Sequence, residues 1–236
     1  MKLKIIIPVN TSAFTSLIRE SIQPVLTPDM KVDIEAISAG TPYIESRVDL
    51  ATNAPHVIEL AKKTEADGYD GIFVTDMDMC GVEASRQAIS IPIIGGFRAS
   101  AYTAMMLAQR FSIITVENVI DLQNEHIRAF GIVNNLASIR PLDIKVPNLA
   151  DPEQHNKILE DITKEALLAI EKDGAGAIMF GCTGFIHFAR DLSKVLKKKT
   201  GKYIPVLDPN CSAISYLALL VKNKLSQSQL TYPLQK

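Results

Sequence analysis

The sequence predicts an α/β protein built from two similar halves, each a parallel sheet covered by helices. Short apolar runs of strand length alternate with helical patterns along the 236 residues. These runs contain few polar positions, which is typical of parallel strands buried on both faces. The stretches DGYDGIFVTDMDMCG, from Asp67, and DGAGAIMFGCTGF, from Asp173, look like two copies of one strand-to-loop element.

The first half is expected to hold four strands joined by helices. Each strand is a short apolar run, and each helix pattern keeps its apolar residues on one face. The expected strands are residues 3–8, 32–37, 71–75 and 92–95. The expected helices are residues 15–26, a long helix from 46 or 55 to 65, and residues 82–89.

The second half repeats this order. Its expected strands are residues 111–115, 138–142, 177–180 and 204–207, and its expected helices are residues 99–108, 119–130, 155–172, 185–198 and 213–224. The polar tail beyond residue 224 is expected to fray. We expect one domain at residues 1–97 with about 212–236, and a second at residues 98–211.

Composition and charge argue against several classes of partner. A net charge of -1 offers no electrostatic attraction to nucleic acid or to an anionic membrane. No apolar run approaches the ~18 residues of a membrane span, and the run before Pro8 is too short for a signal peptide. The three cysteines form no CxxC pair and the histidines show no metal-ligand spacing. We therefore expect a cytoplasmic protein without a metal.

The repeated element places a thiol at the position of a carboxylate. The two copies are offset by 106 residues (173 minus 67), and at that offset Cys182 falls on Asp76. In open parallel sheets the ligand lies at the carboxyl ends of the strands, so we expect an active site in a cleft between the two halves. Two opposed acid/base groups can remove a proton from a carbon next to a carbonyl and return it from the other face. Alternatively, Cys182 is a buried thiol and Asp76 a helix N-cap.

Developing negative charge on a carbanion needs hydrogen-bond donors nearby, and loops after strands can supply them. Asn10, Thr11 and Ser12 follow the first strand, and Thr115 is expected at the corresponding place in the second half. Arg98 follows a strand end, where it either holds a substrate carboxylate or pairs with an acid at the surface. His187 is expected to be a capping or core residue. The candidate substrate-binding residues are Asn10, Thr11, Ser12, Thr75, Arg98, Thr115, Thr183 and Gly184.

Ordered motifs along nearly the whole chain resemble the aspartate/glutamate/hydantoin racemase superfamily, and most of all its hydantoin racemase branch. The motifs are IPVNTS (residues 7–12), GTPYIES (40–46), IPIIG (91–95), RFSIIT (110–115) and GCTG (181–184). The resemblance implies two α/β domains with the site between them, no cofactor, a small carboxylated substrate and a homo-oligomer, either a dimer or higher. It also implies two cysteines acting as base and acid.

The chain departs from this pattern at the first of these cysteines. Cys182 falls on the second cysteine of the family, whereas Asp76 occupies the place of the first, or Thr75 if the alignment slips by one residue. Cys80 lies four residues further on and is a poor substitute. We expect a cofactor-independent racemase or epimerase acting at the α-carbon of an amino acid or a carboxylated derivative. The alternatives are a one-thiol decarboxylase or isomerase of a small diacid, of the malonate or maleate type, and a non-catalytic small-acid binding protein.

Overall fold

The computed structural model describes residues 1–235 and divides into two compact units. The first unit comprises Met1–Gly96 and Asn210–Lys236, and the second comprises Phe97–Pro209. These boundaries differ by one and two residues from those expected at positions 97 and 211. Among the described residues, no helix is both long and apolar enough to cross a membrane.

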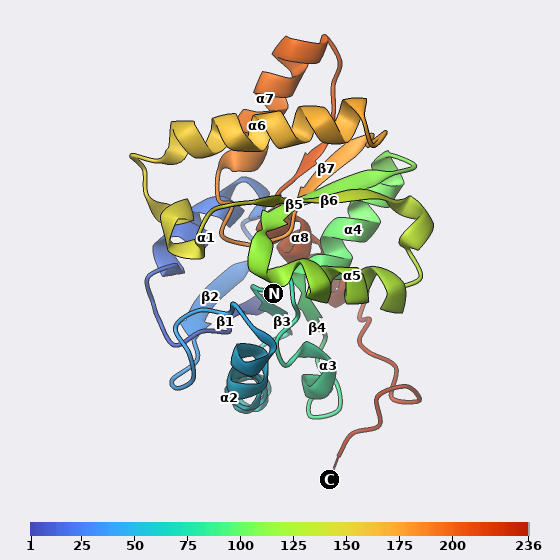
Figure 1. Ribbon diagram of the computed structural model, residues 1–236. Coiled ribbons are helices and arrows are strands. Elements are labelled where there is room, and N and C mark those ends of the chain that lie inside the picture. Colours follow the sequence, from blue (N-terminus) through green and yellow to red (C-terminus); the bar gives the residue numbers. More distant parts are fainter. Residues whose placement is uncertain (236) are drawn as a thin grey trace. The chain divides into compact units, whose positions relative to one another are not determined.

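The first unit is built on a parallel sheet of four strands in the order β2-β1-β3-β4 (Figure 1). The strands are β1 Lys2–Ile7, β2 Lys31–Ala36, β3 Gly71–Val74 and β4 Ile93–Gly95. The helices are α1 Thr15–Ile22, α2 Arg47–Ala66, α3 Val82–Ser85 and α8 Pro209–Lys222. Strand β3 is buried along its whole length, as its apolar sequence predicts.

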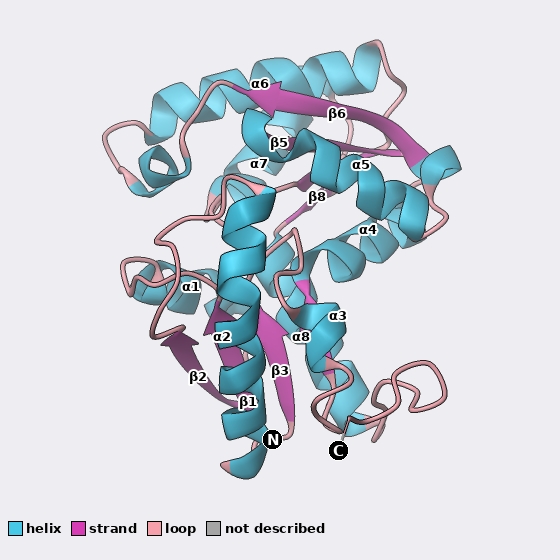
Figure 2. Ribbon diagram, turned by 60° about the horizontal axis from the view of Figure 1, so that its bottom comes forward, coloured by secondary structure: helices cyan, strands magenta, loops and turns pink. Residues whose placement is uncertain are grey.

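The second unit repeats this arrangement, with strand order β6-β5-β7-β8, again all parallel. Figure 2 labels β5, β6 and β8 among the strands of this sheet. Its strands are β5 Phe111–Val116, β6 Leu136–Leu142, β7 Ala177–Phe180 and β8 Val206–Leu207. Its helices are α4 Gly96–Leu107, α5 Ile120–Ala129, α6 His155–Glu171 and α7 Phe188–Thr200. The predicted fold class of two equivalent parallel sheets covered by helices is confirmed.

Two helices belong to a different unit from the strand that they follow in the chain. Helix α8 follows β8 but packs on the first unit, where a Cβ at Gly71 would lie 2.9 Å from Leu217 Cδ1. Helix α4 follows β4 but belongs to the second unit, where a Cβ at Gly176 would lie 3.0 Å from Ala108 Cβ, one residue beyond the helix. The glycines allow the chain segments to approach closely at both places.

Several elements are shorter than the sequence suggests. Helix α1 ends at Ile22 and is followed by a 3-10 turn, Gln23–Val25, because Pro24 cannot continue the backbone hydrogen bonds. The helix expected at residues 82–89 covers only Val82–Ser85, and α7 begins three residues late. The remaining 3-10 segments are Glu117–Val119, Val133–Asn135 and Val146–Ala150.

The tail beyond residue 224 is held by hydrogen bonds, so the expectation that it frays is wrong. Gln227 Nε2 donates to the carbonyls of Ile89 and Ile91, at 2.8 and 2.9 Å. Tyr232 donates its hydroxyl proton to Glu83 Oε2 at 2.8 Å. The tail contains few apolar residues, and its polar side chains find partners that only the tertiary structure brings near.

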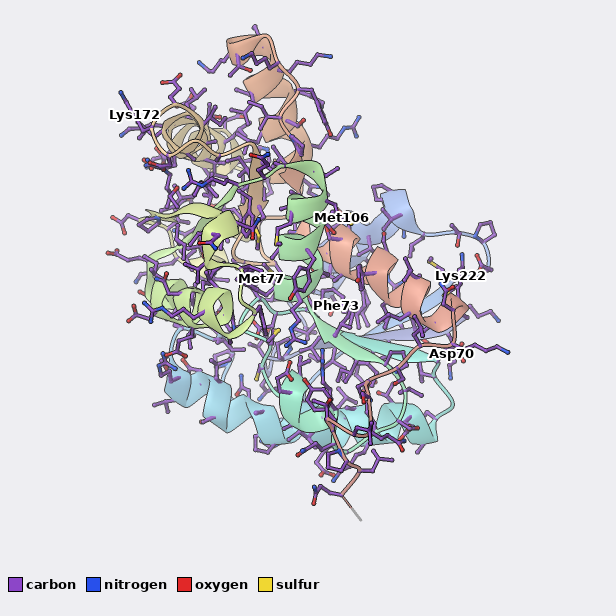
Figure 3. The ribbon with its side chains drawn as sticks, turned by 90° about the vertical axis from the view of Figure 1, so that its right-hand side faces the viewer. Asp70, Phe73, Met77, Met106, Lys172 and Lys222 are labelled. Carbon is purple, nitrogen blue, oxygen red and sulfur yellow. The ribbon has the colours of Figure 1, made fainter. Side chains whose placement is uncertain are left out.

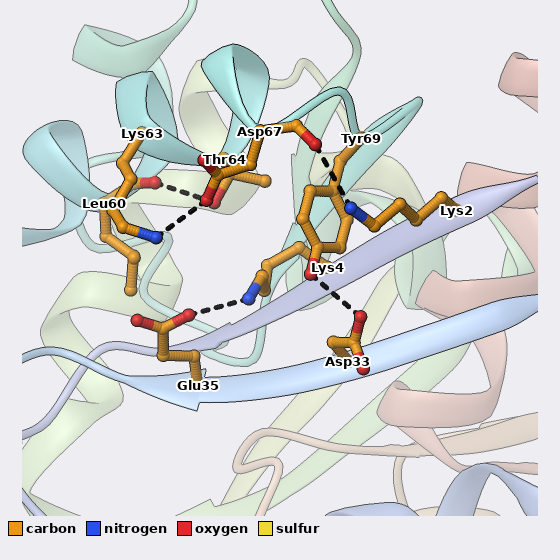
Figure 4. Close-up of polar contacts among 9 residues, drawn as sticks. All are labelled: Lys2, Lys4, Asp33, Glu35, Leu60, Lys63, Thr64, Asp67 and Tyr69. Carbon is orange, nitrogen blue, oxygen red and sulfur yellow. Dashed lines mark hydrogen bonds and ion pairs between the residues drawn. The ribbon is translucent and has the colours of Figure 1, made fainter.

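A polar network joins β1, β2 and the turn before β3 (Figure 4). Lys4 is buried, and its Nζ lies 2.7 Å from Glu35 Oε2. Tyr69 donates to Asp33 Oδ2 at 2.8 Å, and Lys2 Nζ lies 3.9 Å from the centre of the Tyr69 ring. Burial of Lys4 is tolerated because Glu35 pairs with its charge and its Nζ lies 4.7 Å from the centre of the Tyr69 ring.

Candidate active site

Asp76 lies just beyond the end of β3 in the first unit. Val74, the last residue of β3, pairs with Ile6 of β1. The backbone N–H of Thr75 extends the ladder by donating to the Ile6 carbonyl at 2.9 Å. Met77, which follows Asp76, is seen beyond the end of this strand (Figure 3). Asp76 is therefore the first residue after the ladder, at the carboxyl end of the sheet.

Cys182 has the same place in the second unit. Phe180, the last residue of β7, pairs with Ile114 of β5, and the N–H of Gly181 donates to the Ile114 carbonyl at 2.8 Å. Cys182 follows as the first residue after the ladder. The register of the two sheets thus makes Cys182 equivalent to Asp76, as the 106-residue offset predicts.

The Asp76 carboxylate is buried and is held by its own loop. The Asp78 N–H donates to Oδ1 at 3.1 Å, and the Cys80 N–H donates to Oδ2 at 2.8 Å. Burial raises the pKa of the Asp76 carboxyl, while the backbone donors of Cys80, Asp78 and Met77 act against that rise. The Asp76 carboxyl therefore holds its proton to a higher pH than an exposed aspartate does, as an acid/base group working near neutral pH must.

Asp78 and Cys80 complete the titratable groups of this loop. Burial, followed by the charge of Asp76, raises the pKa of the Asp78 carboxyl well above its ordinary value. Burial and the charges of both aspartates also raise the pKa of the Cys80 thiol. That thiol donates to the Leu50 carbonyl at 3.6 Å. Cys80 is therefore protonated near neutrality and unsuited to act as a base.

The Cys182 loop supplies a donor to its own sulfur. The Gly184 N–H lies 3.3 Å from Cys182 Sγ, and the cysteine is partly exposed and outside any disulfide. A backbone donor aimed at sulfur favours the thiolate over the thiol. Thr183 and Gly184 are both partly exposed beside it. This places both predicted binding residues in the same loop as the predicted catalytic thiol.

A buried glutamine links this loop to β5. Gln123 of α5 is 0% exposed, and its Nε2 donates to Thr115 Oγ1 at 3.0 Å and to the Gly181 carbonyl at 2.7 Å. Thr115 lies within β5 rather than after it, and the register makes it equivalent to Ile7 instead of Asn10. The expected correspondence of Thr115 with the Asn10 loop is therefore wrong, because β5 continues to Val116.

The loop of Asn10, Thr11 and Ser12 follows β1 and is tied to the GTPYIES segment. The Asn10 N–H donates to the Thr41 carbonyl at 2.9 Å. Asn53 of α2, 0% exposed, donates through Nδ2 to the Pro8 carbonyl at 2.9 Å, and its Oδ1 accepts from the Thr41 N–H at 2.7 Å. One amide side chain thus holds the segments on which the two N-terminal motifs lie.

Inside the first unit, Thr75 is buried and donates its hydroxyl proton to Asn210 Oδ1 at 2.9 Å.

In the second unit, Arg98 lies within α4, because the helix begins at Gly96 directly after β4. Its guanidinium stacks 4.1 Å from the centre of the Phe130 ring. His187 is exposed at the start of α7, with a φ of 70°.

Asn53 and Gln123 were not among the predicted site residues, although the sequence contains a signal for both. Each is a polar residue in phase with the buried stripe of its helix, four residues before Val57 and Ile127, respectively. A buried amide at such a position must satisfy its hydrogen bonds through tertiary contacts.

Among residues 1–235, no group of three or more His, Cys, Asp and Glu side chains could hold a metal ion.

Two equivalent parallel sheets, with a carboxylate and a thiol at the same strand end, define an α/β protein with an internal repeat. The family model of Asp/Glu/Hydantoin racemase matches residues 3–217. The chain belongs to this family, and it is an isomerase of the racemase class. The resemblance seen in the sequence motifs is thereby confirmed.

The matches to individual relatives cover most or all of the chain. The hydantoin racemase of Pseudomonas sp. (strain NS671) is 30% identical, with 100% of this chain and 93% of that protein covered. The hydantoin racemase of Paenarthrobacter aurescens is 30% identical over 89% of this chain and 86% of that protein. The structure of allantoin racemase from Klebsiella pneumoniae matches with a TM-score of 0.90 and 27% identity, covering 100% of this chain and 95% of that one.

Proposed function

We propose that the protein is a cofactor-independent racemase that inverts a carbon bearing an acidic hydrogen next to a carbonyl group. Cys182 Sγ, as thiolate, removes the proton from one face of the substrate, and the electron pair of the broken C–H bond moves into the adjacent carbonyl to form an enolate. The Asp76 carboxyl returns a proton to the opposite face. In the reverse direction the two groups exchange roles.

The observation that carries this proposal is the equivalent register of the two groups. Asp76 and Cys182 each follow the ladder of the third strand of their sheet, at the carboxyl ends where α/β proteins bind ligands. A pair of acid/base groups related by a repeat is suited to approaching one carbon from two faces. The raised pKa of Asp76 supports its part, because an acid must hold its proton near the working pH.

The substrate class we propose is the ring of 5-substituted hydantoins, including allantoin, with carboxylated amino-acid derivatives as the neighbouring class. The relatives with hydantoin racemase in their names match the chain over 89–100% of its length. Arg98 was expected either to hold a substrate carboxylate or to pair with an acid. Its stacking on Phe130 gives the guanidinium another role, which supports a substrate without a carboxylate. The donors proposed to bind the substrate are Asn10, Thr11, Ser12 and Thr183, because the Gly184 N–H already donates to Cys182 Sγ.

Proton NMR in deuterated water tests the proposal directly. The purified protein is incubated with each enantiomer of 5-substituted hydantoins, allantoin, N-carbamoyl amino acids, amino acids and substituted malonates, and enzyme-free samples give the background exchange. We expect loss of the α-proton signal with inversion for hydantoins, and no loss above background for Cys182→Ala. Absence of any exchange across the panel would contradict the proposal.

A second candidate is one-thiol chemistry, as in a decarboxylase, with Cys182 as the acid. The observation that favours it is that both Asp76 oxygens already accept backbone N–H groups, so that Asp76 serves as a loop cap. The same NMR experiment separates the two candidates. Release of carbon dioxide from a malonate, or exchange at one enantiomer with retention of configuration, would favour the one-thiol mechanism.

A further inference from the structure

The residue before Cys182 is a glycine because a buried amide fills the space of its side chain. A Cβ at Gly181 would lie 2.5 Å from Gln123 Nε2 and 2.6 Å from Thr115 Oγ1. The backbone at Gly181 has no positive φ, so conformational freedom does not explain the glycine. Space does, since the Gln123 amide lies between β5 and the end of β7.

The amide constrains the peptide group that leads into Cys182. Gln123 Nε2 donates to the Gly181 carbonyl at 2.7 Å, while the Gly181 N–H is fixed to Ile114 at 2.8 Å. The Gly181 carbonyl and the Cys182 nitrogen belong to one planar unit, so the hydrogen bond from Gln123 sets the direction in which Cys182 leaves the strand. The second Gln123 proton, on Thr115 Oγ1 at 3.0 Å, holds the amide itself.

The first unit holds its equivalent loop in a different way. Thr75 stands where Gly181 stands in the second unit, and its side-chain hydroxyl donates to Asn210 Oδ1 at 2.9 Å. There an amide of α8 anchors a side chain, whereas in the second unit an amide of α5 anchors a backbone carbonyl. The backbone anchor is the more direct of the two, because it acts on the peptide bonded to the thiol residue.

We infer that Gln123 is a positioning residue for Cys182: through the Gly181 carbonyl it keeps Cys182 Sγ within reach of the Gly184 N–H, which lies 3.3 Å away. The importance of Gln123 for catalysis rests on the proposed function, whereas the hydrogen bonds that position Cys182 do not depend on it. Loss of the anchor frees the Gly181–Cys182 peptide to rotate and weakens the donor that stabilises the thiolate. The reactivity of the sulfur therefore falls, although the substitution is at Gln123 and leaves the Cys182 side chain itself unaltered.

The test compares thiol alkylation in Gln123→Met with the unmodified chain. Iodoacetamide is added at pH 7.5, and peptide mass spectrometry follows Cys182 and Cys211 separately, with Cys211 of the first unit as the internal reference. We expect alkylation of Cys182 to slow about fivefold, as loss of one hydrogen bond implies, and that of Cys211 to stay unchanged. Gln123→Leu, which also removes both amide donors, serves as the second variant if Gln123→Met does not fold.

The control is Thr163→Val, which removes a buried hydroxyl of α6 bonded only to the carbonyl of Leu159 in its own helix. Both thiols should react at the unmodified rate in this variant. Unchanged or faster alkylation of Cys182 in a folded Gln123 variant would overturn the inference, as would an equal change at Cys211.

Turnover separates this inference from the proposed function. If hydantoins are racemised, the Gln123 variants should lower kcat while KM changes less than about twofold, because positioning of the base matters most in the transition state. If the unmodified protein turns over no substrate but alkylation of Cys182 still depends on Gln123, the proposed function fails and the positioning role stands.

Discussion

The backbone N–H of Cys80 donates a 2.8 Å hydrogen bond to Asp76 Oδ2, so the carboxylate proposed for catalysis also closes its own loop. Its other oxygen accepts from Asp78. A thiol at this position could accept such bonds only weakly. The replacement that we propose for the first thiol of the family thus comes with a loop that supports a carboxylate.

Asp76→Asn should abolish most racemisation and lower stability. The amide cannot transfer a proton as the carboxyl does, so we expect at least about a 100-fold loss of the inversion rate. One backbone donor also loses its acceptor, at a cost of about 1–3 kcal/mol in the free energy of unfolding. Chiral chromatography of the product and urea denaturation measure the two effects.

The matched control for Asp76→Asn is Asp49→Asn, which alters a carboxylate that also accepts a backbone N–H, from Glu45 at 3.1 Å. It should lower stability slightly and leave the inversion rate unchanged. Inversion by Asp76→Asn at the unmodified rate would remove Asp76 from the mechanism and favour the one-thiol candidate.

Asp78→Asn should stabilise the protein at pH 8 and have little effect at pH 4. The folded-state pKa of Asp78 lies well above the ordinary value of 3.8, so the ionised carboxyl is unfavourable in the folded state. Its cost is absent below 3.8 and grows as the pH rises through the raised pKa. The amide does not ionise, so we expect a melting temperature higher by about 2–6 °C at pH 8.

The charge of Asp76 contributes to this raised pKa, which allows an internal check. In an Asp76→Asn background, the gain from Asp78→Asn at pH 8 should shrink. A gain of equal size at pH 4 and pH 8 would contradict the assignment of the effect to ionisation.

Asn53→Ala should damage two loops at once. The variant leaves the Pro8 carbonyl and the Thr41 N–H without their shared amide partner, so we expect a loss of about 2–4 kcal/mol in the free energy of unfolding. If the Asn10 loop binds substrate, KM should rise more than kcat falls. The control is Thr64→Val on the same buried face of α2, whose hydroxyl bonds only to the Leu60 carbonyl of its own helix. Equal kinetic effects of both variants would argue against a role for the Asn10 loop.

Two ion pairs of the first unit should differ in strength, although both measure 2.7 Å (Figure 4). Lys4 is buried against Glu35, whereas Lys63 and Asp67 are 62% and 46% exposed. Lys4→Met should lower the free energy of unfolding by about 1–2 kcal/mol, because the Glu35 side chain is 42% exposed and stays partly solvated without its partner. Lys63→Met should have a smaller effect, because water screens a pair whose two members are both exposed. Double-mutant cycles with Glu35→Gln and Asp67→Asn measure the pairwise energies, and similar values for the two pairs would contradict the effect of burial.

Much of the fold and part of the candidate site could be predicted because they depend on local patterns. Apolar runs and helical spacing indicate the strands, and the offset between Asp67 and Asp173 aligns Asp76 with Cys182 from the order of the residues alone. Helix ends were less predictable, because α7 begins at Phe188 only after a loop that holds His187 at positive φ. The tail was misjudged because the partners of Gln227 and Tyr232 are more than a hundred residues away.

By itself, the sequence determined the two-unit α/β architecture, the family and the equivalence of Asp76 with Cys182, because periodicity and internal repetition are properties of the chain's order. Only the tertiary structure decided how those groups are held. It closed a turn around Asp76, placed the Gln123 amide against Gly181 and stacked Arg98 on Phe130. The burial of Asp76 and the contacts of Gln123 and Arg98 depend on residues distant in sequence, and they set the protonation and direction of the side chains.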